Sequence, residues 1–184
     1  MKLIFFVFGF FAVVASQAQH ENHTTPVSST NAQAKSPRKT AMAQVGKNHV
    51  HIDYGSPSVR GRNIWNGLVA YNQVWATGAH KATWIDFSTD VMLEGKKISK
   101  GKYGFFTIPG KDEWVLILSK DWDMHLADAY KPENDAFRIT VKPTINKDLT
   151  EALTYKVIKN SDKDGRIEMS WEYITVALQF ENLK

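Results

Sequence analysis

Apolar and polar residues alternate one by one along much of the chain after residue 36. Every second residue between His49 and Tyr54 is apolar, and segments 137–142 and 174–181 repeat this pattern. Such alternation places the apolar side chains of a strand on one face, as in antiparallel sheets with one face in water. Segment 114–118 is apolar on both sides and predicts a strand that is covered on both faces.

Turn residues separate these segments at short intervals. The clearest turns are expected at 94–96, 109–112 and 161–165. We count about nine or ten strands and one place for a short helix, at 122–130. Parallel βαβ units would require longer helices than this pattern contains. The sequence therefore predicts an all-β fold, a single antiparallel β-sandwich or flattened barrel over residues 36–184.

The first 18 residues have the pattern of a signal peptide. Lys2 precedes an unbroken apolar run from Leu3 to Val14, and small residues occupy the positions that signal peptidase reads, Ser16 and Ala18. This run is shorter than the roughly 20 residues that span a bilayer, so we expect cleavage after Ala18. The expected result is a periplasmic or secreted protein without membrane insertion after signal cleavage.

The composition of the chain predicts a flexible leader and excludes several kinds of site and partner. Residues 19–35 are polar and contain Pro26, so we expect a flexible leader ahead of the folded domain. The chain has no cysteine, which excludes disulfides, thiolate metal sites and thiol nucleophiles. The formal net charge of +4 is spread along the chain and favours neither nucleic acid nor anionic lipid as a partner.

Two histidines and one acidic turn contain residues that could ligate a metal ion. His49 and His51 are two residues apart and could ligate a metal together with His80 or His125. They equally fit the solvent face of a strand, which is the simpler interpretation. Segment 160–165 resembles the start of a calcium loop, but position twelve is Trp171 and not a carboxylate, so we expect a hairpin turn. We therefore predict no metal and no cofactor.

Catalytic patterns are equally open to simpler interpretations. Asp121 and Asp123 precede His125 and could serve acid–base chemistry, but they also suit the start of a helix, where carboxylates cap free amides. A serine nucleophile would be expected in a Gly-x-Ser-x-Gly elbow, and the sequence contains none.

Two loops depart most from ordinary turn composition and form the candidate ligand site. In the first, Gly61 permits a tight turn between Arg60 and Arg62, which suits recognition of carboxylate, phosphate or sulfate. The second loop could add small donors. The candidate ligand-binding residues are Arg60, Gly61, Arg62, Thr77, Gly78 and His80. Alternatively, the arginines pair internally with acids such as Asp53, Asp86 or Glu172 and hold the loops in place.

Several glycine-anchored blocks in one order resemble the domain of unknown function 2911 family. The blocks are Ser36-Pro37, YGSPSVRGRNIW at 54–65, VWATGA at 74–79 and GKKISKGKYGFFTIP at 95–109. The likeness runs from about Ser36 to Phe180. It implies a β-rich fold in an exported protein of the periplasm or outer envelope of Bacteroidetes-type bacteria, and it implies no established activity.

The match to the family pattern differs between positions. Five candidate site residues match it: Arg60, Gly61, Arg62, Thr77 and Gly78. Four positions carry residues other than the arginines, asparagine and acid of the usual pattern: Ser56, Ala76, His80 and Lys81. The resemblance therefore implies that a polar site of the relatives is altered in this chain.

These features favour a non-catalytic domain that binds a small anionic or carbohydrate ligand in the cell envelope. The candidate stacking surfaces are Trp65, Trp75 and Trp84. One alternative is a structural or partner-binding envelope protein. Another is a hydrolase of envelope material that uses His80 with Asp53 or Asp86 as an acid–base pair.

Overall fold

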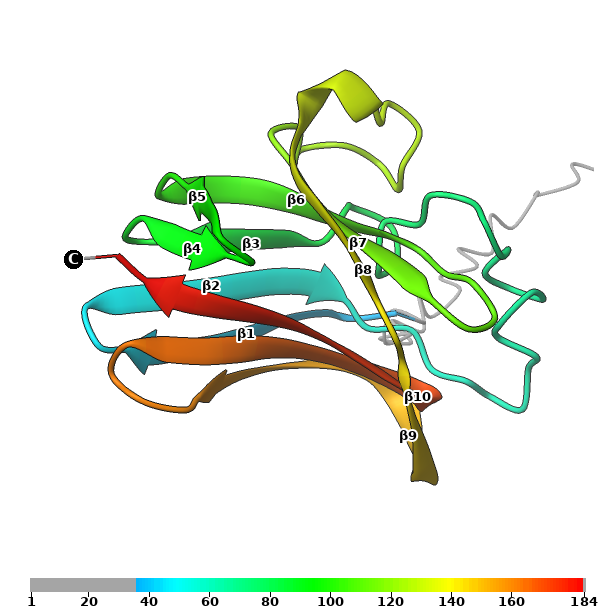
Figure 1. Ribbon diagram of the computed structural model, residues 1–184. Helices are drawn as coiled ribbons and strands as arrows, with labels where there is room; N and C mark the ends of the chain where they lie inside the picture. Colours follow the sequence, from blue (N-terminus) through cyan, green and yellow to red (C-terminus); the bar gives the residue numbers. More distant parts are fainter. Residues whose placement is uncertain (1–35, 184) are drawn as a thin grey trace, which may run out of the picture. The chain divides into compact units, whose positions relative to one another are not determined.

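Two antiparallel β-sheets pack face to face in the structure, a computed structural model that describes residues 36–183 (Figure 1). The strands are β1 (Arg38–Val45), β2 (Asn48–Gly55), β3 (Trp84–Phe87), β4 (Val91–Leu93), β5 (Lys96–Ile98), β6 (Gly101–Ile108), β7 (Trp114–Ser119), β8 (Asp135–Val141), β9 (Thr144–Lys159) and β10 (Asp164–Asn182). One sheet has the order β1-β2-β3-β6-β7-β8 and the other β5-β4-β10-β9. The predicted all-β sandwich is confirmed, whereas the predicted signal peptide and leader lie outside the described residues.

The main core lies between the two sheets and follows the predicted alternation. In β2, Val50, Ile52 and Tyr54 are buried, while the residues between them face outward. Aromatic rings join the sheets, because the centroid of Tyr54 lies 4.7 Å from that of Tyr155 in β9. Burial of these apolar side chains is the main term that stabilises a domain without disulfides.

Strand β7 is covered on both faces, as its sequence predicts. Leu116 and Leu118 point into the main core. Ile117 points to the outer face and packs in a second, smaller core with Phe106 of β6. Residues from the connection between β2 and β3 and from the segment after β7 cover this smaller core. The outer face of the six-stranded sheet is therefore only partly open to solvent.

The connection 56–83 between β2 and β3 lies at the right-hand end of the sandwich in Figure 1. Four tryptophans pack together where it meets the sheets. They are Trp65, Trp75, Trp114 and Trp171, with ring centroids 4.8 to 5.9 Å apart in the contacting pairs. Two of the predicted stacking surfaces, Trp65 and Trp75, thus pack against the main core, and Trp84 is half-buried on the outer face of β3.

The short helix predicted at 122–130 is wrong in position. Residues 126–129 form turns, and the helical turn of the described chain is a 3₁₀ helix, η1, at Pro132–Asn134. The backbone before the turns is already paired with the β2–β3 connection, because Leu126 N donates to His80 O and Ala82 N donates to Met124 O. A helix would have to break this pairing. No helix between residues 36 and 183 is long and apolar enough to cross a membrane.

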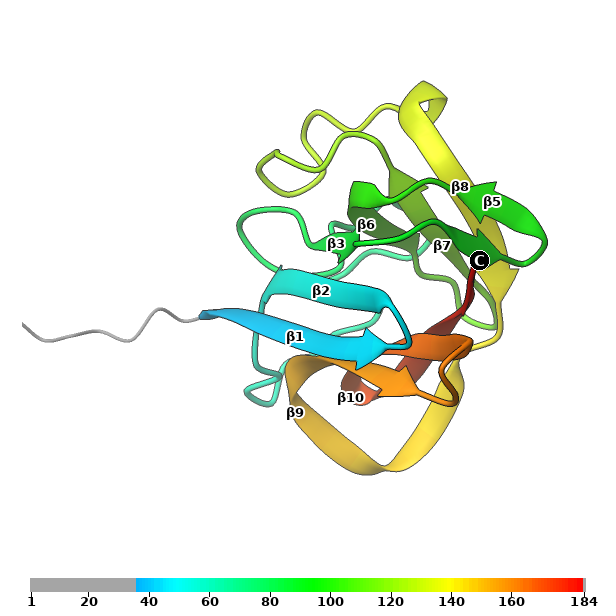
Figure 2. The same ribbon diagram turned by 90° about the vertical axis from the view of Figure 1, so that its left-hand side faces the viewer.

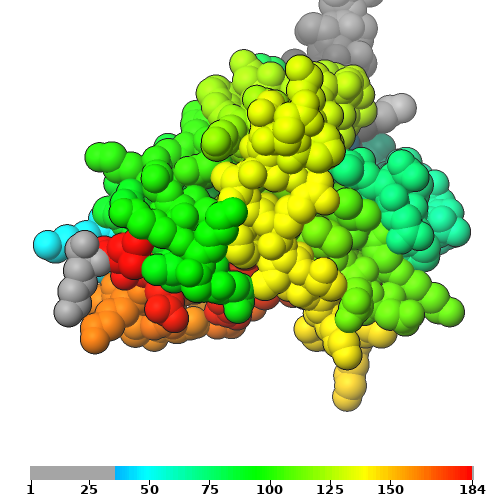
Figure 3. All heavy atoms as spheres, turned by 45° about the horizontal axis from the view of Figure 1, so that its top comes forward, coloured from blue at the N-terminus to red at the C-terminus, as the bar shows by residue number. Residues whose placement is uncertain are grey.

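The β9–β10 ribbon is long and irregular. Its register shifts between Ser170 and Glu172 and again between Glu172 and Ile174, and Glu172 has a φ of +55°. Irregularities of this kind bend a strand. The start of β9 projects at the lower edge of Figure 3. Ile145, in the same part of this strand, is 79% exposed.

Candidate ligand-binding hollow

Turns and strand ends meet around a hollow at the end of the sandwich that carries the C-terminal end of β10. Figure 2 looks onto this end and shows the β1–β2 turn, the β9–β10 turn and the end of β10 beside one another. The hollow has a volume of about 780 Å³, within the size range of small-molecule sites. We call it the lysine hollow, because its lining includes Lys47, Lys100 and Lys163.

Two side-chain amides hold these turns together. Asn48 is fully buried, and its Oδ1 accepts hydrogen bonds from the backbone N–H groups of Ser88 (3.0 Å) and Thr89 (3.3 Å). Its Nδ2 donates to Asn182 Oδ1 over 3.0 Å. Asn182 Nδ2 in turn donates to the carbonyl oxygens of Val45 (2.8 Å) and of the β9–β10 turn (3.1 Å). The walls of the hollow are therefore fixed by hydrogen bonds of the protein itself.

Gly46 allows the β1–β2 turn to approach the β9–β10 turn. Its φ is +56°, and a Cβ atom at this position would lie 2.1 Å from the carbonyl oxygen of Asp162. No side chain fits in that space, and the left-handed conformation also favours glycine. The close contact brings Lys47, the next residue, to the edge of the hollow.

The charges of the hollow are not balanced within its lining. Its two acids are paired with lysines that do not line it, Asp90 with Lys97 over 2.8 Å and Asp162 with Lys159 over 2.5 Å. These hydrogen bonds are the main reason that the pKa of each carboxylate lies below its ordinary value.

The lining lysines are not held in close ion pairs, although the charge of Lys100 acts on the Asp90 carboxylate at longer range. Among residues 36–183, no ion pair involves the ammonium groups of Lys47, Lys100 or Lys163. The hollow thus has three ammonium groups in its lining, whereas the charges of its two carboxylates are neutralised by lysines outside the lining. This arrangement attracts anions.

Hydroxyl groups add hydrogen-bonding capacity. Ser88 and Thr89 both line the hollow. Thr89 Oγ1 is buried and has no hydrogen-bond partner within the described chain. Because this oxygen has no exposed surface, the lining hydroxyl residue that a ligand in the hollow can reach is the exposed Ser88.

Sequence comparison identifies the family of this β-sandwich. The model of the family described as "Protein of unknown function (DUF2911)" matches residues 36–180. The chain belongs to the DUF2911 family. The match confirms the resemblance inferred from the glycine-anchored blocks. No curated protein and no solved structure matches the sequence.

The six site residues predicted from the sequence do not line the lysine hollow of this DUF2911 domain. Two of them are buried and serve internal contacts. Thr77 Oγ1 donates to the carbonyl oxygen of Trp75 over 3.1 Å and lies 3.1 Å from the hydroxyl of Thr107. The carbonyl of Gly78 accepts a hydrogen bond from the Trp75 indole over 3.1 Å.

The first candidate loop, residues 54–62, which we call the arginine loop, is hydrogen-bonded to β9. Val59 N donates to Glu151 O over 2.7 Å, and Arg60 N donates to the carboxylate of Glu151 over 2.9 Å. The guanidinium of Arg62 donates to two carbonyl oxygens of its own loop, those of Ser58 (2.5 Å) and Val59 (3.1 Å). Arg62 therefore closes its loop through backbone carbonyls rather than through an acid.

The remaining predicted residues, Arg60, Gly61 and His80, are exposed. The carbonyl of Thr77 accepts a hydrogen bond from Tyr155 on β9, the strand to which the arginine loop is also fastened. The two loops meet directly, because a Cβ atom on Gly55 would lie 2.1 Å from the carbonyl oxygen of Ala79 and one on Gly78 would lie 3.2 Å from the carbonyl oxygen of Gly55. Ligand binding by the six residues stays a prediction.

The other polar groups of the sequence have structural surroundings. The ring of His51 packs edge-on against Trp84, with centroids 5.0 Å apart, and no group of three metal-ligating side chains occurs within residues 36–183. Segment 160–165 contains the predicted hairpin turn, because Asn160 N and Ser161 N both donate to the carbonyl of Asp164. Asp121 caps no helix, and its carboxylate accepts a hydrogen bond from the Asn134 side chain over 2.6 Å.

The sequence contains one signal that points to the lysine hollow. Each lining lysine lies in a connection between successive strands: Lys47 between β1 and β2, Lys100 between β5 and β6, and Lys163 between β9 and β10. Lysine in a turn is ordinary, so the signal is informative only when the strand directions bring these turns to the same end of the sandwich.

Proposed function

We propose that this protein is a non-catalytic binding domain of the cell envelope whose lysine hollow takes a small anionic ligand with hydroxyl groups, such as a sugar acid or a sugar phosphate. The observation that carries the proposal is the excess of unpaired ammonium groups over compensated acids around a preformed hollow. Ammonium groups supply charge for the anion. The exposed Ser88 and the neighbouring backbone supply hydrogen bonds to the rest of the ligand.

The chemistry of the lining favours binding over catalysis. Asp90 and Asp162 are held in the ionised form by their lysine partners, which makes them weak proton donors at neutral pH. The hydrolase alternative rests on His80, which is exposed and makes no hydrogen bond to a carboxylate within residues 36–183. The envelope setting rests on the expected signal peptide at residues 1–18.

Calorimetric titration of the purified protein tests the proposal. The probes are inorganic phosphate, glucose 6-phosphate and glucuronate, with glycerol as the uncharged comparison. We expect the anionic probes to bind, with an affinity that falls as salt is added, because exposed charges are screened. The triple variant Lys47→Gln, Lys100→Gln and Lys163→Gln should lose this binding and keep the fold.

A second triple variant controls for net charge. Lys39→Gln, Lys111→Gln and Lys142→Gln remove the same number of charges from exposed positions outside the hollow. This variant should bind the probes like the unchanged protein. Equal losses in the two variants, or no binding by any probe, would reject the proposal. The second outcome would favour the structural or partner-binding alternative, and turnover of a probe would favour the hydrolase.

A further inference from the structure

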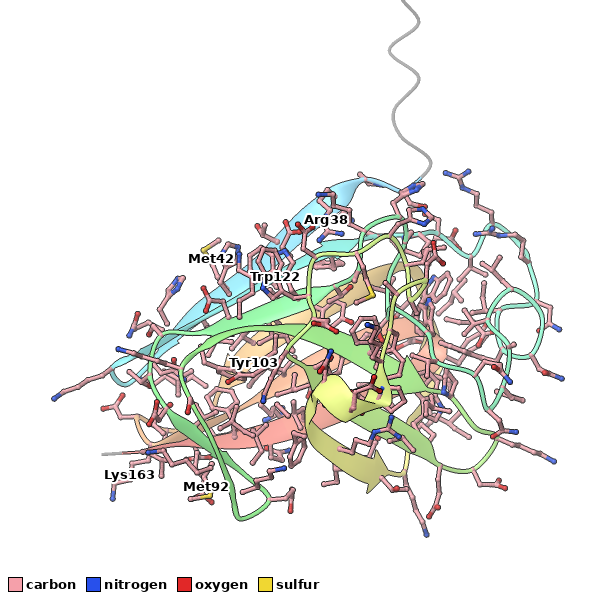
Figure 4. All side chains as sticks on the ribbon, turned by 90° about the horizontal axis from the view of Figure 1, so that it is seen from above. Arg38, Met42, Met92, Tyr103, Trp122 and Lys163 are labelled. Atoms are coloured by element: carbon pink, nitrogen blue, oxygen red, sulfur yellow. The ribbon has the colours of Figure 1, made fainter. Side chains whose placement is uncertain are left out.

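Two tryptophans flank one lysine on the outer face of the six-stranded sheet. The Nζ atom of Lys102 in β6 lies 3.9 Å from the ring centroid of Trp84 in β3 and 4.4 Å from that of Trp122. Figure 4 shows Trp122 on the same side of the molecule as Arg38 and Met42 of β1. Both indole rings are half-buried, so each keeps part of its surface in contact with solvent.

The backbone holds Trp122 firmly in this place. Gly104 of β6 pairs with Trp84, and a Cβ atom on Gly104 would lie 2.4 Å from the carbonyl oxygen of Asp121 and 3.2 Å from the Cα of Trp122. The segment after β7 therefore lies directly on β6, beside Trp84. On its other side, the hydrogen bond from Asn134 to the Asp121 carboxylate fixes the same segment.

A second hollow opens beside Trp122. Its volume is about 400 Å³, and Trp122 and Met124 supply apolar wall. We call it the Trp122 hollow. The charged lining residues are Lys120, Asp121, Asp123 and Lys131. None of these residues lines the lysine hollow.

The lining of the Trp122 hollow contains as many lysines as aspartates, whereas that of the lysine hollow contains one lysine more. Two lysines face two aspartates, and Lys81 lies 3.6 Å from the Asp123 carboxylate. An anionic ligand would meet the two carboxylates, and a cationic ligand would meet the lysines together with Lys102. The lining therefore suits an uncharged ligand that both donates and accepts hydrogen bonds.

We propose that the Trp122 hollow binds a neutral pyranose sugar. The apolar C–H face of the sugar ring packs on the indole of Trp122, which offers a flat apolar surface with a polar N–H at one edge. Sugar hydroxyls donate to the carboxylates of Asp121 and Asp123 and accept from the ammonium groups of Lys120 and Lys131. This site and its ligand class are independent of the anion site proposed above.

NMR titration of the ¹⁵N-labelled protein with methyl glycosides of glucose, galactose, mannose and N-acetylglucosamine tests the proposal. We expect at least one glycoside to shift the indole N–H signal of Trp122. The Trp122→Ala variant should raise the Kd of that glycoside about tenfold, because the stacking surface is lost. Trp122→Phe keeps a flat ring and should retain most of the affinity.

Trp84→Phe is the matched control, because Trp84 also contacts Lys102 but does not line the Trp122 hollow. It should leave the Kd unchanged. Circular dichroism of all variants checks the fold. If no glycoside shifts the Trp122 signal, or if Trp84→Phe weakens binding as much as Trp122→Ala does, the sugar site is rejected. The lysine-hollow triple variant should bind the glycosides normally, so failure of the anion site is recognised separately.

Discussion

The side-chain amide of Asn48 donates a hydrogen bond of 3.0 Å to the side-chain carbonyl of Asn182, although the two residues are 134 positions apart in the chain. This bond joins β2 of one sheet to β10 of the other. It lies beneath the lysine hollow, where both amides also bind backbone groups of neighbouring turns. The stability of the sandwich and the shape of the hollow therefore depend on the same pair.

Asn48→Ala should destabilise the protein by about 2 to 3 kcal/mol, because it leaves the N–H groups of Ser88 and Thr89 without their buried acceptor. Urea denaturation measures the loss. Gln73→Ala, which removes an exposed amide, should change the free energy of unfolding by less than about 0.5 kcal/mol. Equal effects of the two substitutions would contradict the bridging role of Asn48.

Arg38 is predicted to fasten β1 to its neighbours. Its guanidinium pairs with the Asp53 carboxylate and donates to the carbonyl oxygens of Lys81 (2.8 Å) and Ala82 (3.1 Å). Arg38→Lys should cost about 1 to 3 kcal/mol, since one ammonium cannot reproduce this planar set of donors. Thermal unfolding measures the effect, and Lys39→Ala at the next, exposed position is the control. A melting temperature that is the same for both variants would show that the guanidinium contacts contribute nothing.

Gly104→Ala should destabilise the protein by about 3 kcal/mol, because the new methyl group would overlap the backbone of Asp121. Gly61→Ala is the comparison. Gly61 has a φ of +65° and open space around it, so this substitution should cost only about 1 kcal/mol of backbone strain. Chemical denaturation ranks the two, and the reverse order would show that the contact between β6 and the Asp121–Trp122 segment is easily displaced.

Tyr130 is predicted to make stability fall in alkaline solution. Burial, followed by the hydrogen bond to Asp135, raises its pKa from 10.0 to about 12. Because the folded state binds this proton more tightly than the unfolded state, the stabilisation is complete below pH 10 and is lost as the pH rises towards about 12.

Tyr130→Phe should flatten the decline of unfolding free energy over this pH interval. Spectrophotometric titration of the phenolate should lose one group with a midpoint near 12. Parallel stability curves for the two proteins would mean that Tyr130 ionises as it would in the unfolded chain.

Much of the fold could be predicted because the order of apolar and polar residues in a strand depends on which of its faces are buried. The one-sided pattern around Val50 and Ile52 reflects one core, and the two-sided pattern of 114–118 reflects two cores, with Ile117 facing the smaller one. Both patterns follow from the burial of strand faces, and they can be read from the two-residue period of the sequence.

The helix and the hollows could not be predicted in the same way. The residues at 122–130 have a composition that suits a helix, but their backbone pairs with the β2–β3 connection, which no local pattern records. The lysine hollow combines turns from four parts of the chain, and Lys47 and Lys163 become neighbours of one hollow only through the pairing of the strands. The arginine loop was predicted to bind a ligand because of its composition. Instead, the guanidinium of Arg62 donates hydrogen bonds to backbone carbonyls of its own loop.

The position of β10 has a consequence for how the domain forms during synthesis. It follows the other nine described strands in the chain, yet it lies between β4 and β9 in the four-stranded sheet. The β4–β5 hairpin can therefore dock only after about eighty further residues have been added, and closing such a distant contact is slow. Until then part of the inner face of the six-stranded sheet lacks its cover, so folding of this chain depends on a contact between segments far apart in the sequence.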